Sequence, residues 1–168
     1  MTDASRVLVA LRVPASAERA FTVFTEQIAA WWQPNGLFQF TRGRTGTLSF
    51  EPGPQGRLVE TYGDGSTFVI GDIHTWEPPH RLVLSWRQAS FAPDQETELH
   101  VRFDEVDNPQ NAPETRVTVE HFGWDRIPAD HVARHGFPLM AFQQRWAEWW
   151  QAQLQTLSDL AAEPPTDG

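Results

Sequence analysis

The stretch LMAFQQRWAEWWQAQLQTLSDL, residues 139–160, decides the fold. Its large apolar side chains recur every three or four positions, and at 100° per residue this spacing gathers them on one face of an α-helix. They are Leu139, Phe142, Trp146, Trp149, Trp150, Leu154, Leu157 and Leu160. Proline is favoured in the first helical turn, so we expect the helix to begin near Pro138. A helix with so broad an apolar face needs an equally broad apolar surface to cover it.

The preceding residues predict that surface as a series of strands. Residues 7–13 alternate apolar and polar side chains, which is typical of a half-buried strand. Further apolar runs are separated by Gly, Pro and Asp turns; they cover residues 37–41, 46–51, 57–62, 67–76, 81–87, 96–103 and 115–122. Because short connections join neighbouring strands in antiparallel sheets, we expect a curved antiparallel sheet of six to seven strands wrapped around the last helix, an α+β fold.

Two short helices are expected between the first and second strands. Ser16 is a suitable N-cap residue, and apolar residues follow at helical spacing up to Trp31. The sequence indicates a single domain over residues 5–162 and a disordered tail over residues 163–168. We find no signal-peptide pattern and no apolar run long enough to cross a bilayer, so we expect a cytoplasmic protein.

Composition argues against several classes of function. The net charge is −9, and all 13 basic residues are scattered arginines. Nucleic acids need a clustered basic face and anionic membranes attract basic segments, so we expect neither partner. The chain lacks cysteine, phosphate loops and dinucleotide motifs, and no cofactor is expected. His131 and His135 have the spacing of two ligands on a helix, but two ligands do not close a zinc site, so no metal is expected.

Aromatic residues are unusually frequent, with 8 tryptophans and 11 phenylalanines. They fit either a well-filled core or an aromatic-lined cavity, and composition leaves both open. Strand alternation and the apolar helix face select the residues for a small cavity between the sheet and the last helix. The predicted ligand-binding residues are Trp31, Tyr62, Phe68, Trp76, Leu84, Trp86, Val101, Val119, His121, Phe142, Trp146 and Trp149.

His121 is the candidate catalytic residue. Alternation places it on the same strand face as Val117 and Val119, so we expect an inward-pointing ring. One interpretation is a core histidine with a backbone or tryptophan partner. The other is a pocket residue that orients a ligand or moves a proton, with Asp72 or Glu60 as an acidic partner.

Four stretches resemble one family. They are residues 14–21 followed by Trp-Trp-Gln-Pro at 31–34, residues 71–86 with their double proline and final tryptophan, residues 115–123 with histidine and glycine, and Trp150-x3-Leu154-x2-Leu157. They are similar to the Hsp90 ATPase activator homologue-like family within the SRPBCC, or START-like, superfamily. This resemblance implies the helix-grip fold.

The chain departs from the family pattern at two places. Gly46-Thr47 stands where the family often has paired glycines, and Trp149-Trp150 stands where it often has Gly-Trp. The bulk of Trp149 should shrink or reshape a pocket beneath the helix.

Three functions remain open from the sequence. The first is a carrier or sensor of a small hydrophobic or aromatic molecule. The second is a protein-interaction module of the cochaperone, stress-response type, and the third is a cyclase or dehydratase that uses His121. The expected partners are therefore a small hydrophobic ligand and a possible protein, and the chain is expected to be a monomer or a homodimer.

Overall fold

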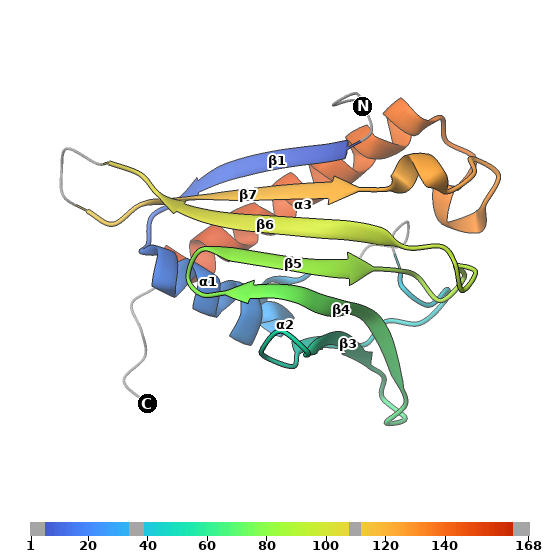
Figure 1. Ribbon diagram of the computed structural model, residues 1–168, viewed down its shortest axis with the longest axis horizontal. Helices are drawn as coiled ribbons and strands as arrows, with labels where there is room; N and C mark the ends of the chain where they lie inside the picture. Colours follow the sequence, from blue (N-terminus) through green and yellow to red (C-terminus); the bar gives the residue numbers. More distant parts are fainter. Residues whose placement is uncertain (1–5, 34–38, 108–111, 163–168) are drawn as a thin grey trace.

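The computed structural model describes residues 6–33, 39–107 and 112–162 (Figure 1). The expected disordered tail at 163–168 lies outside these residues. Within the described residues, seven strands form one antiparallel sheet in the order β1-β7-β6-β5-β4-β3-β2. The strands are β1 (Arg6–Val13), β2 (Thr47–Phe50), β3 (Arg57–Thr61), β4 (Thr67–Glu77), β5 (Arg81–Trp86), β6 (Thr97–Glu105) and β7 (Thr115–Phe122).

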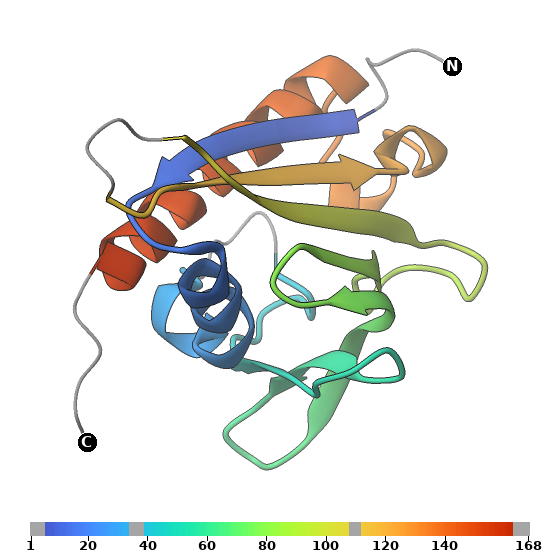
Figure 2. The ribbon, with the colours of Figure 1, turned by 60° about the vertical axis from the view of Figure 1, so that its left-hand side comes forward.

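The helices lie on one face of this sheet (Figures 1 and 2). They are α1 (Ala17–Glu26), α2 (Ile28–Trp31) and α3 (Leu139–Ala162), and two short 3-10 turns, η2 (Trp124–Arg126) and η3 (Val132–Arg134), connect β7 to α3. Ser16 caps α1 as expected, because its Oγ accepts a hydrogen bond from the Arg19 N–H at 3.1 Å. The curled sheet with the long C-terminal helix is the predicted helix-grip fold.

The core lies between the sheet and α3 and follows the predicted alternation. Val101 pairs with Val119 and Leu99 pairs with His121 across β6 and β7, and all four side chains are buried. Five tryptophans are fully buried in the same interior: Trp31, Trp86, Trp124, Trp146 and Trp150. Packed tryptophan side chains therefore occupy most of the interior between the sheet and α3, where the sequence analysis allowed a cavity.

One predicted strand is wrong in its described part. Instead of a strand over 37–41, residues 39 to 41 form a bend with an isolated bridge between Thr41 and Arg44, and residues 37 and 38 lie outside the described residues. The prediction failed because Phe40 is buried although it lies in a bend. Its ring packs against Trp86 with a ring-centroid distance of 5.1 Å. The backbone carbonyl of Phe40 accepts a hydrogen bond from the N–H of Ala89, not from a strand ladder.

None of the helices in the described ranges is both long and apolar enough to cross a bilayer.

Candidate functional site

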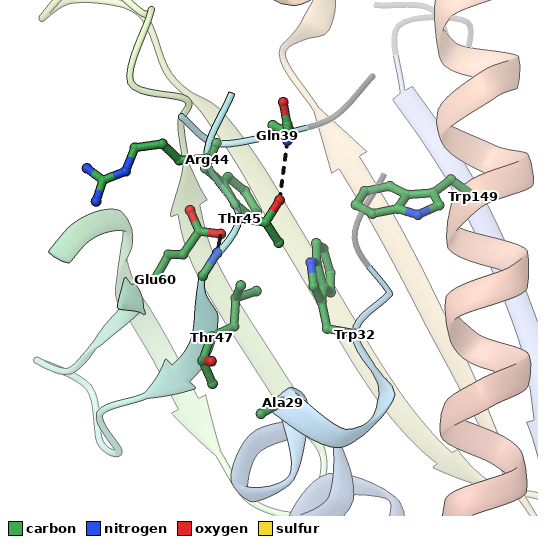
Figure 3. A pocket seen from close by; sticks show the side chains of 11 residues that line it. Ala29, Trp32, Gln39, Arg44, Thr45, Thr47, Glu60 and Trp149 are labelled. Atoms are coloured by element: carbon green, nitrogen blue, oxygen red, sulfur yellow. Dashed lines mark hydrogen bonds between the residues drawn. The ribbon is translucent and has the colours of Figure 1, made fainter. Parts of the chain in front are cut away.

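A cavity of about 210 Å³ opens where α2, the segment before β2, β3 and α3 meet (Figure 3). One side is largely apolar and the opposite side is polar. The lining residues are Ala29, Trp32, Gln39, Phe40, Arg44, Thr45, Gly46, Thr47, Leu48, Glu60 and Trp149. This arrangement suits a small molecule with an apolar body and a polar edge.

The apolar wall is formed by three aromatic rings. The indole of Trp32 meets that of Trp149 edge to face, with ring centroids 4.8 Å apart, and stacks on Phe40 at 5.9 Å. Trp32 is only half-buried, whereas Phe40 and Trp149 are buried. The wall therefore presents aromatic surface to the cavity without a rearrangement of the core.

Trp32 is held in place by a buried amide on α3. Gln153 accepts a hydrogen bond from the Gln33 N–H at 2.8 Å and donates one to the Gln33 carbonyl at 3.2 Å. Trp31, the residue before Trp32, is fully buried. Its indole N–H donates to the Val23 carbonyl at 3.1 Å. These two anchors fix the chain where α2 ends and direct Trp32 toward the cavity.

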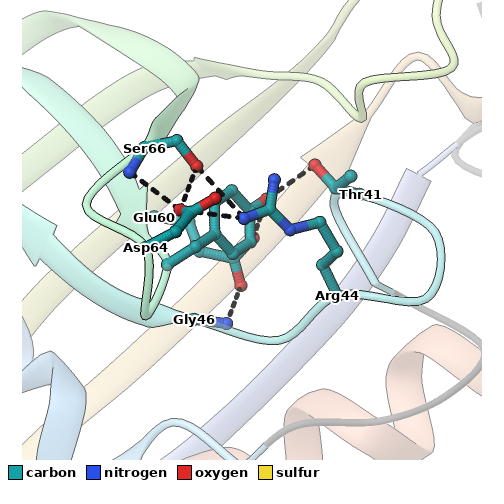
Figure 4. A network of polar contacts seen from close by, with 7 residues as sticks. Thr41, Arg44, Gly46, Glu60, Asp64 and Ser66 are labelled. Atoms are coloured by element: carbon teal, nitrogen blue, oxygen red, sulfur yellow. Dashed lines mark hydrogen bonds and ion pairs between the residues drawn. The ribbon is translucent and has the colours of Figure 1, made fainter.

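The polar wall centres on the buried carboxylate of Glu60 (Figure 4). Its Oε2 accepts a hydrogen bond from the Gly46 N–H at 3.0 Å, and its Oε1 lies 2.6 Å from the Tyr62 hydroxyl. The Tyr62 hydroxyl also lies 2.6 Å from Thr41 Oγ1. A Cβ on residue 46 would lie 2.4 Å from the carbonyl oxygen of Thr61, so only glycine brings its N–H this close.

Arg44 covers the outer side of this network (Figure 4). Its guanidinium lies 3.9 Å from the centre of the Tyr62 ring, and it forms an ion pair with Asp64 at 3.1 Å and a hydrogen bond with Ser66. Burial and the hydrogen bond to Glu60 raise the pKa of Tyr62, which keeps its proton at neutral pH. Within the described residues Glu60 itself forms no ion pair.

His121 lies in the core, away from this cavity. Its Nε2 is 2.7 Å from Thr97 Oγ1, and that hydroxyl donates to the carbonyl of Trp86 at 3.0 Å. The hydroxyl has one proton, so the imidazole donates through Nε2, and no described residue bonds Nδ1. Burial lowers the pKa of His121 to about 3, so the ring is neutral.

The suggested acidic partners of His121 do not contact it. Glu60 is engaged by Gly46 and Tyr62, and Asp72 is exposed on β4. The three aromatic rings closest to the imidazole are Trp86, Trp124 and Trp146, at centroid distances of 5.3 to 5.4 Å. In the part of the chain that the structure describes, the imidazole packs in the core and bonds Thr97, and no carboxylate bonds it.

Of the 12 residues predicted to bind a ligand, Trp149 lines the cavity, and Tyr62 supports it through Glu60. Trp76 packs edge to face on Phe21, with centroids 5.2 Å apart, and borders a separate hollow beside Phe50. Phe68 is partly buried against the core. The others lie within the packed interior: Trp31, Leu84, Trp86, Val101, Val119, His121, Phe142 and Trp146.

Most of the residues that line the cavity were not among the predicted ligand-binding residues. Trp32 could have been chosen as a candidate, because it belongs to the Trp-Trp-Gln-Pro motif that carries the family resemblance. Glu60 was considered only as a partner for His121. Gln39 and Phe40 were assigned to a strand, and nothing in their spacing indicates a cavity wall.

A second hollow, of about 590 Å³, lies beyond Phe40 and Gln39, which line both spaces. Its far side includes Gln88 and residues of η3. Residues 129–135 do not form the α-helix that would put His131 and His135 one turn apart, because only η3 is helical there. His131 caps η3 by accepting the Ala133 N–H at 3.0 Å, and His135 has a left-handed backbone with a φ of 52°.

A curled seven-stranded sheet gripping a long helix, with a cavity at one side, defines a helix-grip protein of the SRPBCC type. The chain belongs to the activator of Hsp90 ATPase homolog 1-like family, whose model matches residues 14–159.

Solved structures share this fold. One is the anthrahydroquino-γ-pyrone synthase Txn09, determined in complex with SUM; it is 31% identical, with a TM-score of 0.52 over 90% of this chain and 96% of that chain. An HSP90 activator from Plasmodium falciparum is 17% identical, with a TM-score of 0.60 over 95% and 98% of the two chains. The Aha1 dimer from Colwellia psychrerythraea is 16% identical, with a TM-score of 0.60 over 93% and 95%. No curated protein gives a match.

Proposed function

We propose that this protein binds a small planar aromatic molecule in the cavity beside Trp32 and Trp149, as a carrier or sensor. The observation that carries the proposal is the aromatic wall of Trp32, Phe40 and Trp149 facing a polar wall around Glu60. Small-molecule pockets commonly combine such surfaces and measure about 300–1,000 Å³. The cavity of about 210 Å³ is smaller, so it suits a ligand of about two fused rings.

The comparison with Txn09 supports an aromatic ligand. Its name denotes a synthase of a fused aromatic compound, and it shares 31% identity with this chain over 90% of the length. The Hsp90 activator and the Aha1 dimer are 17% and 16% identical, and at that level the likeness concerns the fold alone.

A protein-docking role has less support. Such a role calls for a broad exposed apolar patch. Among the described residues, the large apolar side chains that are well exposed are Leu8, Val132 and Met140. The larger aromatic surfaces instead face the cavity or the core, which favours a small-molecule ligand.

Equilibrium dialysis with naphthalene tests this proposal without relying on tryptophan fluorescence. We expect the protein to bind the probe and Trp32→Leu to weaken binding about tenfold, the effect of losing about 1.4 kcal/mol of aromatic contact. Trp76→Leu is the matched control, because Trp76 is also a partly buried tryptophan but lies outside the cavity. Circular dichroism verifies that both variants are folded. Absence of binding up to the solubility limit of naphthalene, or equal losses in the two variants, would refute the proposal.

A further inference from the structure

We infer that Glu60 makes the cavity selective for aromatic molecules that carry a free hydroxyl group, and that it excludes aromatic carboxylates. This inference rests on the proposed function and adds the chemical class of the ligand. It follows from the hydrogen-bonding state of Glu60, from the direction of the Tyr62 proton and from the charges around the polar wall.

Glu60 has acceptor capacity that the protein does not use. A carboxylate offers about four lone-pair positions. Within the described ranges two groups donate to Glu60, the Gly46 N–H at 3.0 Å and the Tyr62 hydroxyl at 2.6 Å. Glu60 is 4% exposed and borders the cavity. A buried carboxylate is stable only when it is well hydrogen-bonded, so the side of Glu60 that borders the cavity favours a ligand that brings a donor.

The hydroxyl proton of Tyr62 is already donated to Glu60 in a hydrogen bond. The tyrosine hydroxyl has one proton and two neighbours at 2.6 Å, Glu60 Oε1 and Thr41 Oγ1. The carboxylate can only accept, so Tyr62 donates to Glu60 and Thr41 donates to Tyr62. The raised pKa of Tyr62 agrees with this arrangement. Tyr62 therefore holds the carboxylate in place and has no proton left for a ligand.

Among the described residues that line the cavity, the cation Arg44 and the side-chain amide of Gln39 also have partners. Arg44 pairs with Asp64 and packs over the Tyr62 ring. Gln39 donates to Thr45 Oγ1 at 3.3 Å and accepts the Gly43 N–H at 3.1 Å. An aromatic carboxylate would thus place a second negative charge beside Glu60, where the charge of Arg44 is already paired with Asp64. A neutral phenol would instead donate a charge-assisted hydrogen bond, which is stronger than one between neutral groups.

Three naphthalenes that differ in one substituent test the inference: 2-naphthol, 2-methoxynaphthalene and 2-naphthoate, measured by equilibrium dialysis at pH 7. We expect 2-naphthol to bind at least about tenfold more tightly than 2-methoxynaphthalene, a difference of about 1.4 kcal/mol, and 2-naphthoate to bind most weakly. Glu60→Gln removes the charge at nearly constant shape. It should bring the first two affinities closer together and improve the binding of 2-naphthoate.

Glu51→Gln is the matched control, because Glu51 is exposed and pairs with Arg57 away from the cavity; it should leave all three affinities unchanged. Tyr62→Phe provides a second variant if Glu60→Gln does not fold, and it should free one carboxylate lone pair and preserve the rejection of 2-naphthoate. Equal binding of 2-naphthol and 2-methoxynaphthalene by the native protein would overturn the inference and leave the proposed function standing. Failure of all three compounds and of naphthalene to bind would overturn both.

Discussion

Acidification from pH 6.5 to pH 5 should lower the free energy of unfolding by about 1.6 kcal/mol through His121 alone. The folded-state pKa of about 3 lies below the ordinary value of 6.5, because burial disfavours the charged ring. Between these values the unfolded chain binds a proton that the folded chain does not. This stability is therefore fully present well above pH 6.5. Its slope is half of the limit at pH 6.5 and approaches about 1.4 kcal/mol per pH unit between pH 6 and pH 4.

Urea unfolding at pH 7.5, 6.5, 5.8 and 5.0 measures this slope. His121→Gln should remove most of it, because glutamine does not titrate. His74→Gln is the control, since His74 is exposed on β4 and its replacement should leave the slope unchanged. A native protein whose stability is constant from pH 6.5 to pH 5, or an equal slope in the His121→Gln variant, would show that the buried ring is not what couples folding to pH.

Trp86→Ala should lower the free energy of unfolding by about 3–5 kcal/mol, the usual cost of removing a buried aromatic side chain. Trp86 is 1% exposed. Its ring contacts five others: Trp32, Phe40, His121, Trp146 and Trp150, at centroid distances of 5.1 to 6.4 Å. Because Trp86 supports both Trp32 and Phe40 from behind, the variant should also lose binding of naphthalene.

The loss of stability is measured by urea unfolding at pH 7.5. Met140→Ala is the control, because this side chain is 80% exposed and its removal should change stability by no more than about 0.5 kcal/mol. A loss below about 1.5 kcal/mol for Trp86→Ala would mean that the tryptophans do not form the close-packed interior described above.

Local periodicity was enough to predict the fold. Burial alternates along a strand and recurs every three to four residues along a helix. The last helix and the six described strands after β1 were therefore predicted within a few residues of their bounds. The same alternation placed His121 in the interior. The run at 37–41 failed because Phe40 is buried from a bend, and an apolar run does not distinguish a buried bend from a strand.

The cavity could not be predicted in the same way because it depends on where regular patterns end. Trp31 and Trp32 are adjacent, but α2 ends at Trp31 and Trp32 is extended, with a ψ of 118°. On β3, three successive buried residues, Leu58, Val59 and Glu60, break the alternation at a register shift. The register shift has no sequence signal. The contacts beside Trp32 and at Glu60 come from residues 120 and 14 positions away, because Gln153 bonds Gln33 and Gly46 bonds Glu60.

Trp149 shows what the family pattern could and could not indicate. Its bulk, where relatives often have glycine, led us to expect a smaller or reshaped pocket beneath the helix. In the structure its indole packs on Trp146 at 4.9 Å and on Trp32 at 4.8 Å. The space under α3 is thereby occupied, and the outer side of the same ring becomes a wall of the cavity.

A crystal structure of the protein soaked with 2-naphthol tests the central claim most directly. We predict that the naphthalene rings lie against Trp32 and Trp149, with the hydroxyl oxygen within about 2.5–3.0 Å of a Glu60 carboxylate oxygen, the range of an O–H···O hydrogen bond. A ligand bound in the core beside Trp86 and His121, or bound in this cavity with its hydroxyl turned away from Glu60, would contradict the claim.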